Sequence, residues 1–463
     1  MLFSSLTFIF LFLPVVLAVY YLAPLKIRNL LLLLASLIFY AWGEPVYMVL
    51  MILSILLNYC CGREIAANAE DERKAHRGMI FAVAVNLALL FFFKYYGFFL
   101  ELVNSVTSVE LTYRELALPV GISFYTFQGI SYVVDVYRGK AKAQRSLLNF
   151  ALYIALFPQL IAGPIVRYED IEPQLAQRKV SARKLGQGAM LFLIGLAKKA
   201  VLADTFKTVF EEISAISASN LSVPMAWIGC ITYAFEIYYD FSGYSDMAIG
   251  LGQMFGFHFE ENFKYPYISA TVSEFWRRWH ISLQTWFRDY VYFPLGGSRV
   301  SKPRLVLNLF VVWALTGIWH GANWTFLAWG LLYFVLLTFE KLSGLGKKNY
   351  WWGHIYTMVF VIIGWVIFRS TGMGTAMLYI KAMFGIGAKG FMDKAVWAYI
   401  AQNWIWFVFA LIGCAPIMPR IDEKLGKYKA WNIVYAVGIV TILVVSVSFI
   451  SNNAYNPFIY FNF

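Results

Sequence analysis

The feature that most constrains this chain is a series of long apolar runs separated by short clusters of charged residues. A helix that spans the hydrocarbon core of a bilayer needs about 20 mostly apolar residues. Runs that reach or approach this length lie at 3–23, 29–43, 45–61, 79–100, 116–134, 146–166, 185–203, 223–239, 305–319, 324–339, 354–368, 395–416 and 431–450. The sequence therefore predicts an all-α protein that crosses a membrane many times.

Composition indicates the same class. Hydrophobic residues make up 60% of the 463 residues and charged residues only 14%, whereas an ordinary soluble domain carries roughly 25% charged residues. With a mean hydropathy of +0.63, the chain has too little polar surface to cover a core in water. There is no internal repeat, and no loop is long enough to fold alone. We therefore expect one membrane-embedded domain over residues 1–463.

The basic clusters predict which loops face the cytoplasm. Lys26 with Arg28, the loop at 63–77 and the loop at 138–145 are rich in Lys and Arg, which favours the cytoplasmic side for each. This topology explains the net charge of +12, so no nucleic-acid partner is expected. Residues 1–25 lack the basic start of a cleaved signal peptide, and we expect the first run to be retained as a span.

The run at 146–166 is an exception to simple alternation. Basic residues flank it on both sides, and Pro158 and Pro164 would break a continuous helix. Broken backbone is tolerated at membrane depth only inside protein or beside a wet cavity. We therefore predict a re-entrant segment here, which leaves the C-terminal tail outside the cytoplasm.

The stretch 236–299 differs from the apolar runs because it is rich in charges and aromatic rings. From Ser273 its spacing predicts one amphipathic helix that ends at Gly296 and Gly297. One face of that helix would carry Trp276, His280, Leu283, Phe287 and Tyr290, and the other Glu274, Arg277, Arg278, Arg288 and Asp289. Two interpretations remain open. The helix either lies along the membrane surface or forms a wall of a polar cavity with His280 turned inward.

His320 is the strongest candidate for chemistry. Residues 305–339 contain no Asp, Glu, Lys or Arg, and Arg304 and Lys341 bracket them, which predicts a hairpin that turns between Gly317 and Asn323. Its first arm of about 15 residues is only roughly 22 Å long, so we expect His320 within the membrane profile. An imidazole there can accept a proton from a hydroxyl near neutral pH.

Asn323 and the backbone of the turn are candidate hydrogen-bond donors to an oxyanion. The alternative is a histidine that only hydrogen-bonds a neighbouring helix. The sequence lacks G-x-S-x-G, H-E-x-x-H, P-loop and H-x-x-x-D patterns, which disfavours a serine hydrolase, a metalloprotease and an ATP-driven pump. The four cysteines show no metal-ligand spacing, and no bound metal or cofactor is expected.

Several long motifs resemble the membrane-bound O-acyltransferase superfamily, and within it the bacterial alginate O-acetylation branch. They include RNLLLLLASLIFYAWGEP, LPVGISFYTFQGISYVVDVYRG, FPQLIAGPIVRYEDIEPQL, YYDFSGYSDMAIGLGQMFGF, ENFKYPYISATVSEFWRRWHISLQTWFRDYVYFPLGG and GIWHGANWTFLAWG, and they span essentially the whole chain. The resemblance implies a ring of roughly 10–13 transmembrane and re-entrant helices around a central tunnel. It also implies that His320 and His280 are the two functional histidines. One departure is Tyr333, where relatives often carry His.

The resemblance further implies a location in the bacterial cytoplasmic membrane and a reaction. An acyl group, usually acetyl, passes from a cytoplasmic thioester, either acetyl-CoA or an acyl carrier, to a hydroxyl of an envelope polysaccharide. A periplasmic or extracellular partner with an acetyltransferase or esterase fold would assist. Candidate contacts for the donor are Asn323, Asp240, Ser242, Tyr244, Asp246, Arg277, Arg278, Arg288, Asp289 and Trp276, since arginines bind phosphates. Structural ion pairs are the alternative for each charged residue.

The last six residues contain one hydroxyl, that of Tyr460. A phenol can form a covalent acyl intermediate when a base is near, so Tyr460 is a candidate acyl relay; a membrane-interface anchor is the alternative. Peptidoglycan O-acetylation and D-alanyl transfer to teichoic acid also remain open. Two functions of other classes, an acyl-donor transporter or flippase and an export scaffold, predict that His320 is less critical.

Overall fold

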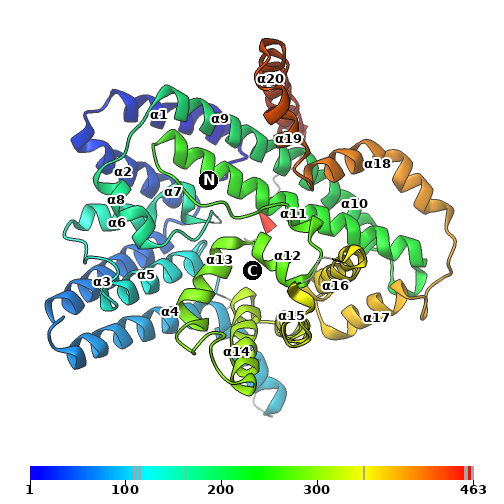
Figure 1. Ribbon diagram of the computed structural model, residues 1–463, viewed down its shortest axis with the longest axis horizontal. Helices are drawn as coiled ribbons and strands as arrows, with labels where there is room; N and C mark the ends of the chain where they lie inside the picture. The colour runs from blue at the N-terminus through cyan, green and yellow to red at the C-terminus, as the bar shows by residue number, and fades with distance from the viewer. Residues whose placement is uncertain (108–110, 113–115, 162, 348–349, 453–456, 460–463) are drawn as a thin grey trace. The chain divides into compact units, whose positions relative to one another are not determined.

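The structure is a computed structural model that describes residues 1–107, 111–112, 116–161, 163–347, 350–452 and 457–459. Helices account for most of these residues, and no sheet forms among them (Figure 1). The extended backbone makes an isolated antiparallel bridge between Phe263 and Trp279. The prediction of an all-α protein is confirmed.

The chain divides into two compact units, one of residues 1–192 and 245–260 and the other of residues 193–244 and 261–463. The helices of the first unit are η1 Phe8–Phe12, α1 Leu13–Leu22, η2 Leu25–Ile27, α2 Arg28–Ala41, α3 Tyr47–Ala67, α4 Glu72–Val106, α5 Ile122–Tyr137, α6 Leu147–Ala155, α7 Phe157–Leu160 and α8 Tyr168–Ala176. Two helices, α9 Ala182–Ala197 and α11 Val223–Met254, have residues in both units.

The second unit contains both candidate histidines. Its remaining helices are η3 Lys198–Ala203, α10 Asp204–Ser214, η4 Ala218–Asn220, η5 Pro266–Ile268, α12 Val272–Arg278, α13 Ile281–Phe287, η6 Arg288–Tyr292, α14 Lys302–His320, α15 Trp324–Ser343, η7 Leu345–Lys347, α16 Trp351–Arg369, α17 Met373–Met383, α18 Lys394–Gly413, α19 Ile417–Leu425 and α20 Lys429–Asn452. Every predicted apolar run coincides with one or more helices.

Six helices in the described part of the chain are long and apolar enough to cross a membrane, namely α3, α4, α15, α16, α18 and α20. The segment Phe8–Leu22 is a shorter apolar helix. The protein is therefore a multi-pass membrane protein, as predicted. The ring, the central tunnel and the single domain stay predictions.

The run at 146–166 is broken, as its prolines predict. Helix α6 ends at Ala155, and Leu156 has ψ 111°, which is outside the helical region. Helix α7 begins at Phe157, whose amide donates to Ser36 Oγ at 3.0 Å. The side-chain amide of Gln159 donates to the carbonyl of Tyr153. Because Leu156, Phe157 and Gln159 are fully buried, this broken backbone lies inside protein, where the amide of Phe157 and the carbonyl of Tyr153 find partners.

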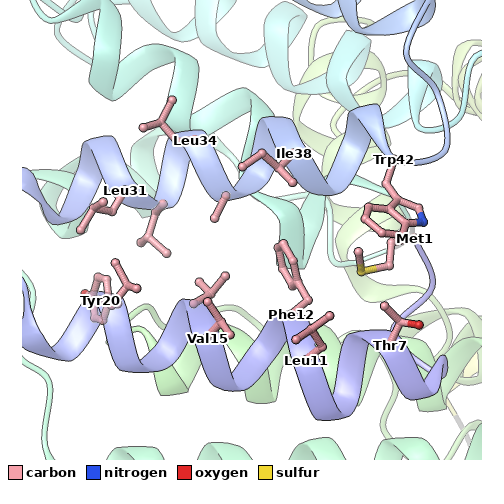
Figure 2. A pocket seen from close by; sticks show the side chains of 14 residues that line it. Met1, Thr7, Leu11, Phe12, Val15, Tyr20, Leu31, Leu34, Ile38 and Trp42 are labelled. Carbon is pink, nitrogen blue, oxygen red and sulfur yellow. The ribbon is translucent and has the colours of Figure 1, made fainter.

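The first unit also contains an apolar cavity of about 380 Å³ between the segment η1–α1 and helix α2 (Figure 2). Leu11 and Val15 line it from one side, and Leu34 and Ile38 from the other. Such a lining suits hydrocarbon and contains no His, Cys, Asp or Glu. It is therefore unsuited to acid–base chemistry, and both histidines lie in the other unit.

Helices α14 and α15 form the predicted hairpin and lie side by side (Figure 1). Gly317 and Gly330 permit this close approach, since a Cβ on Gly317 would lie 2.5 Å from the carbonyl oxygen of Phe326 and one on Gly330 would meet that of Trp313. Helix α14 begins at Lys302, three residues before the predicted start of the arm, with Pro303 in its first turn. The hairpin places His320 at the last position of α14.

Candidate functional site

Helix α12, which leads to His280, is fixed at its start by a carboxylate from another helix. Glu340 of α15 is fully buried, and its two oxygens accept the amides of Val272 at 2.7 Å and Ser273 at 2.8 Å. Thr271 caps the same helix by accepting the amide of Glu274 at 3.0 Å. The negative charge of Glu340 also complements the positive end of the helix dipole. Glu340 therefore ties the start of α12 to the hairpin that carries His320.

The predicted continuous helix from Ser273 is wrong, because it is interrupted at His280. Helix α12 ends at Arg278, and His280 has φ 47°, in the left-handed region. A short extended segment causes the break: Lys264 donates its amide to Arg278 O at 2.9 Å, and Ile281 donates its amide to Asn262 O at 3.0 Å. These bonds replace the helical ones, and α13 restarts the helix after the turn.

The side chain of Asn262 determines which nitrogen of His280 carries the proton. Its Oδ1 atom accepts the backbone amide of Ser282 at 3.2 Å and the Ser282 hydroxyl at 2.9 Å, and it lies 3.1 Å from His280 Nδ1. An atom that accepts from a backbone N–H is the carbonyl oxygen of the amide, so His280 Nδ1 must be a donor. In the neutral ring, Nε2 therefore bears the lone pair.

His280 is enclosed by rings. It is 1% exposed, and burial lowers its pKa to about 3, so the imidazole is neutral at pH 7. The ring of Phe241 meets it edge-on with centroids 4.7 Å apart, and Trp319 lies at 6.3 Å. His280 is therefore turned inward, and its neighbours in the structure are aromatic rings.

His320 is also buried, at 5% exposure. Its ring lies 4.9 Å from Trp319, 4.9 Å from Trp329 and 5.1 Å from Phe368, centroid to centroid. Gly321 follows it, and a Cβ there would collide with the ring of Phe326, so a larger residue at this position would require that ring to move. Because Trp319 contacts both imidazoles, the structure brings the two predicted histidines into one aromatic cluster.

Asn323 has a local role in addition to the one predicted for it. Its Oδ1 accepts the amide of Thr325 at 3.0 Å and so caps α15, while its Nδ2 donates to Thr371 O at 3.1 Å. Both polar atoms of the side chain thus have protein partners. The role of Asn323 as a hydrogen-bond donor to an oxyanion stays a prediction. Other side chains near His320 could donate such a hydrogen bond.

Those donors lie in the aromatic cluster. Trp329 Nε1, Tyr333 Oη and Trp276 Nε1 are buried and have no hydrogen-bond partner among the described residues. Their rings are in contact, Tyr333 lying 4.8 Å from Trp276 and 5.2 Å from Trp329. Buried polar groups without protein partners are typical of sites that bind water or ligand. Of these three residues, Trp276 was predicted as a donor contact from the sequence, and the Tyr at position 333, where relatives often carry His, was the one signal for the others.

The other candidate donor contacts fall into two groups. Asp240, Ser242 and Tyr244 of α11 are buried, and Asp246 is on the same helix. The charged candidates that follow α11 are partly or fully exposed: Arg278 pairs with Glu274 at 2.8 Å, Arg288 with Asp289 at 2.8 Å, and Arg277 is exposed. Only the arginines are therefore placed to meet an anion from solvent.

Tyr460 lies outside the described residues. The preceding residues Phe458 and Ile459 are described and buried, and the amide of Ile459 donates to Asp240 Oδ2 at 2.8 Å. The other oxygen of Asp240 pairs with Lys199 at 2.8 Å. Lys199 was missed because it lies within an apolar run, although a lysine at such a position is itself a signal of function.

The fold and the site together define a class of protein. It is a multi-pass helical membrane protein with two buried histidines in an aromatic cluster. Comparison with known proteins gives the family, since residues 141–378 match the membrane-bound O-acyltransferase family. The chain belongs to this family and is an acyltransferase.

Three relatives illustrate the range of the family. The chain is similar to the probable alginate O-acetylase AlgI of Pseudomonas syringae pv. tomato, with 45% identity over 84% of this chain and 76% of that protein. It is 39% identical to the probable alginate O-acetylase AlgI of Pseudomonas putida over 100% of both chains. It is 34% identical to the peptidoglycan O-acetyltransferase of Helicobacter pylori over 83% of this chain and 80% of that protein.

Proposed function

We propose that this O-acyltransferase moves an acetyl group from a cytoplasmic thioester, acetyl-CoA or an acyl carrier, across the bacterial cytoplasmic membrane to a hydroxyl of a cell-envelope polysaccharide. The relatives support acetyl as the group, because those compared above are named as O-acetylases or an O-acetyltransferase. Alginate or a similar exopolysaccharide is the first candidate acceptor. Peptidoglycan is the second, with the Helicobacter pylori relative in its favour.

The observation that carries this proposal is the pair of buried imidazoles that both contact the ring of Trp319. Buried ionisable groups are costly in a membrane protein and are retained mainly for function. Two buried histidines, together with indole and phenol donors that have no partner among the described residues, supply a base and hydrogen-bond donors at one place. A structural histidine that faces lipid would need neither a second buried imidazole nor free hydrogen-bond donors beside it.

In the proposed reaction His320 is the general base. It takes the proton from the attacking hydroxyl, whose oxygen bonds to the thioester carbonyl carbon. The indole N–H of Trp329, on the ring next to His320, donates to the oxyanion that develops. Collapse of this intermediate breaks the C–S bond, and the proton held by the imidazole passes to the departing thiolate. His280 assists through its Nε2 lone pair.

The acceptor of the first transfer need not be the polysaccharide. Tyr460 follows the buried Ile459 in the chain, so its phenol is a candidate to receive the acyl group and pass it to an extracytoplasmic partner of acetyltransferase or esterase fold. In this version the hydroxyl deprotonated by His320 is that of Tyr460. Intact-mass measurement of Tyr460→Phe decides the point, since an acyl adduct at the wild-type level would exclude the relay.

The proposed function is tested by His320→Ala and His280→Ala in membranes supplied with radiolabelled acetyl-CoA and the envelope polymer. General-base catalysis contributes about 10²–10⁴-fold, so the label in the polymer should fall at least about 100-fold for His320→Ala. His76→Ala, at an exposed histidine of α4, is the matched control. Normal acetylation by a correctly inserted His320→Ala protein would contradict the assignment.

The same variants separate the enzyme from the functions of other classes. An acyl-donor transporter would retain partial flux without a general base, and an export scaffold would not need His320 at all. Loss of polymer acetylation together with wild-type membrane insertion therefore supports catalysis in preference to both.

A further inference from the structure

We infer that the buried ion pair between Lys199 and Asp240 is an internal binding site for the chain's own C-terminal segment, which it holds against Phe241, the ring that contacts His280. The ligand is the backbone N–H of Ile459 together with the ring of Phe458. That this anchoring supports acyl transfer depends on the function proposed above, whereas the anchoring itself can be tested without activity.

Lys199 is held in place by the packing of two helices. It lies in the π-helical turn η3, which directly follows α9, and such turns often mark functional positions. Gly243 of α11 allows the close approach, since a Cβ there would lie 2.7 Å from Gly195 O and 3.0 Å from the amide nitrogen of Lys199. The ammonium group of Lys199 is thereby directed into the protein, and the residue is only 5% exposed.

Two carboxylates share the charge of Lys199. Its Nζ lies 2.7 Å from Asp204 Oδ1 and 2.8 Å from Asp240 Oδ1. Asp204 is therefore sufficient to pair the lysine, and Asp240 adds a second negative charge in a buried place. A buried carboxylate needs hydrogen-bond donors for both oxygens. Asp240 Oδ2 obtains one from the C-terminal segment, the amide of Ile459 at 2.8 Å.

The segment also has a specific place for an aromatic side chain. The ring of Phe458 lies 4.8 Å from that of Tyr244 and 5.7 Å from that of Phe241, and it is 2% exposed. Phe241 in turn makes the edge-on contact with His280 at 4.7 Å. One ring therefore separates the anchored segment from a candidate catalytic histidine.

These contacts distinguish the two aspartates. Both bind Lys199, but only Asp240 accepts the amide of Ile459. Asp240 is consequently a positioning residue that acts through the C-terminal segment.

Limited digestion of the full-length, detergent-solubilised protein with carboxypeptidase Y, followed by intact-mass analysis, tests the anchor. In the wild type, trimming should stop before Ile459, because the bound segment cannot enter the protease. Asp240→Ala should allow trimming past Phe458 at a rate at least tenfold higher. Asp204→Ala, the matched control on the same lysine, should keep the wild-type pattern. Equal trimming of the two variants, or protection in Asp240→Ala, would overturn the inference.

A second pair of variants leaves the buried charges intact and covers the case in which Asp240→Ala does not fold. Ile459→Pro removes the donor N–H, and Ile459→Ala shortens the side chain but keeps the donor. The anchor predicts at least a tenfold loss of kcat for the proline variant, with the donor KM unchanged, and less than threefold for the alanine variant. Equal kcat values for the two would refute it.

His320→Ala separates this inference from the proposed function. It should abolish transfer and leave the trimming pattern as in the wild type. If His320→Ala retains activity while Asp240→Ala still exposes the segment, the proposed function fails and the anchor stands.

Discussion

The two histidines reach the same aromatic cluster by different structural routes. His320 is the last residue of α14, where helix length, a glycine and the turn of an apolar hairpin fix its position locally. His280 lies at a break between α12 and α13, where Asn262, Lys264 and Glu340 fix it from distant parts of the chain. A position of the first kind follows from the local sequence, whereas one of the second kind depends on contacts that are remote in sequence.

The largest effect is expected at the hairpin. Trp329→Phe keeps a ring beside His320 and removes only the indole donor, which has no protein partner in the described structure. Loss of one oxyanion donor costs about 10²–10³-fold in kcat, so kcat should fall by about 100-fold with little change in the donor KM. Steady-state kinetics in proteoliposomes measure both constants. An unchanged kcat would remove Trp329 from the reaction and leave it as a packing residue.

Glu340 connects the two regions, so its loss should reveal how much the break depends on the hairpin. Glu340→Ala leaves the amides of Val272 and Ser273 without their buried acceptor, which we expect to destabilise the protein by roughly 2–4 kcal/mol. Glu340→Gln keeps acceptor oxygen and should cost less. Thermal unfolding in detergent measures the difference. Equal melting temperatures for the wild type and Glu340→Ala would show that the start of α12 does not need this cap.

Substitutions of Asn262 test the second region, the helix break at His280. Asn262→Ala should lower kcat about tenfold, because the proton on Nδ1 and the orientation of His280 lose their partner. In Asn262→Asp a carboxylate would face the Nδ1–H and favour the charged ring, so the pKa of His280 should rise from about 3 by roughly 1–3 units.

The measurement is the pH dependence of kcat/KM for the wild type and Asn262→Asp. The acid limb should move to higher pH in the variant, since the ring is then protonated, and unable to accept a proton, over a wider range. Asn403→Asp, on the distant helix α18, is a control for adding one negative charge. Superimposable profiles for all three proteins would contradict a link between Asn262 and His280.

The smallest effect is expected at the surface. Arg277 is exposed, so Arg277→Ala should change the stability by less than about 0.5 kcal/mol. If this arginine meets the phosphates of the donor, its KM should rise about threefold to tenfold at low salt and less at high salt. Arg420→Ala, on the exposed face of α19, is the matched control. Equal KM values would leave Arg277 as a solvated charge.

Most of the helical framework could be predicted because it is determined by local properties. Each apolar run contains enough residues to form a helix, and the prolines of 146–166 mark the place where one must break. The turn after His320 follows from Gly321 and Asn323, which are strong signals for the end of one helix and the start of the next.

The break at His280 could not be predicted in the same way. Its flanking residues keep a helical spacing of apolar side chains, and nothing in that spacing shows that residues 262–264 will bond to the backbone at 278 and 281. Glu340 was a weak signal of a tertiary contact. It is an acid that follows directly after a run with no charged residue, but its position alone does not name its partners. Its partners Val272 and Ser273 lie almost 70 residues earlier in the chain, beyond the reach of any local rule.

The amino-acid sequence alone is enough to predict that this protein is helical, that it crosses a membrane several times, and that His320 lies at the turn of a hairpin. Hydrophobic length and local turn chemistry are sufficient for each of these. Three features follow only from the packed chain: which nitrogen of His280 carries its proton, which carboxylate holds α12, and the contact of Asp240, paired with Lys199, with the C-terminal segment. Each of these depends on a hydrogen bond or ion pair in a buried place, and such bonds form only after packing has excluded water and brought distant residues together.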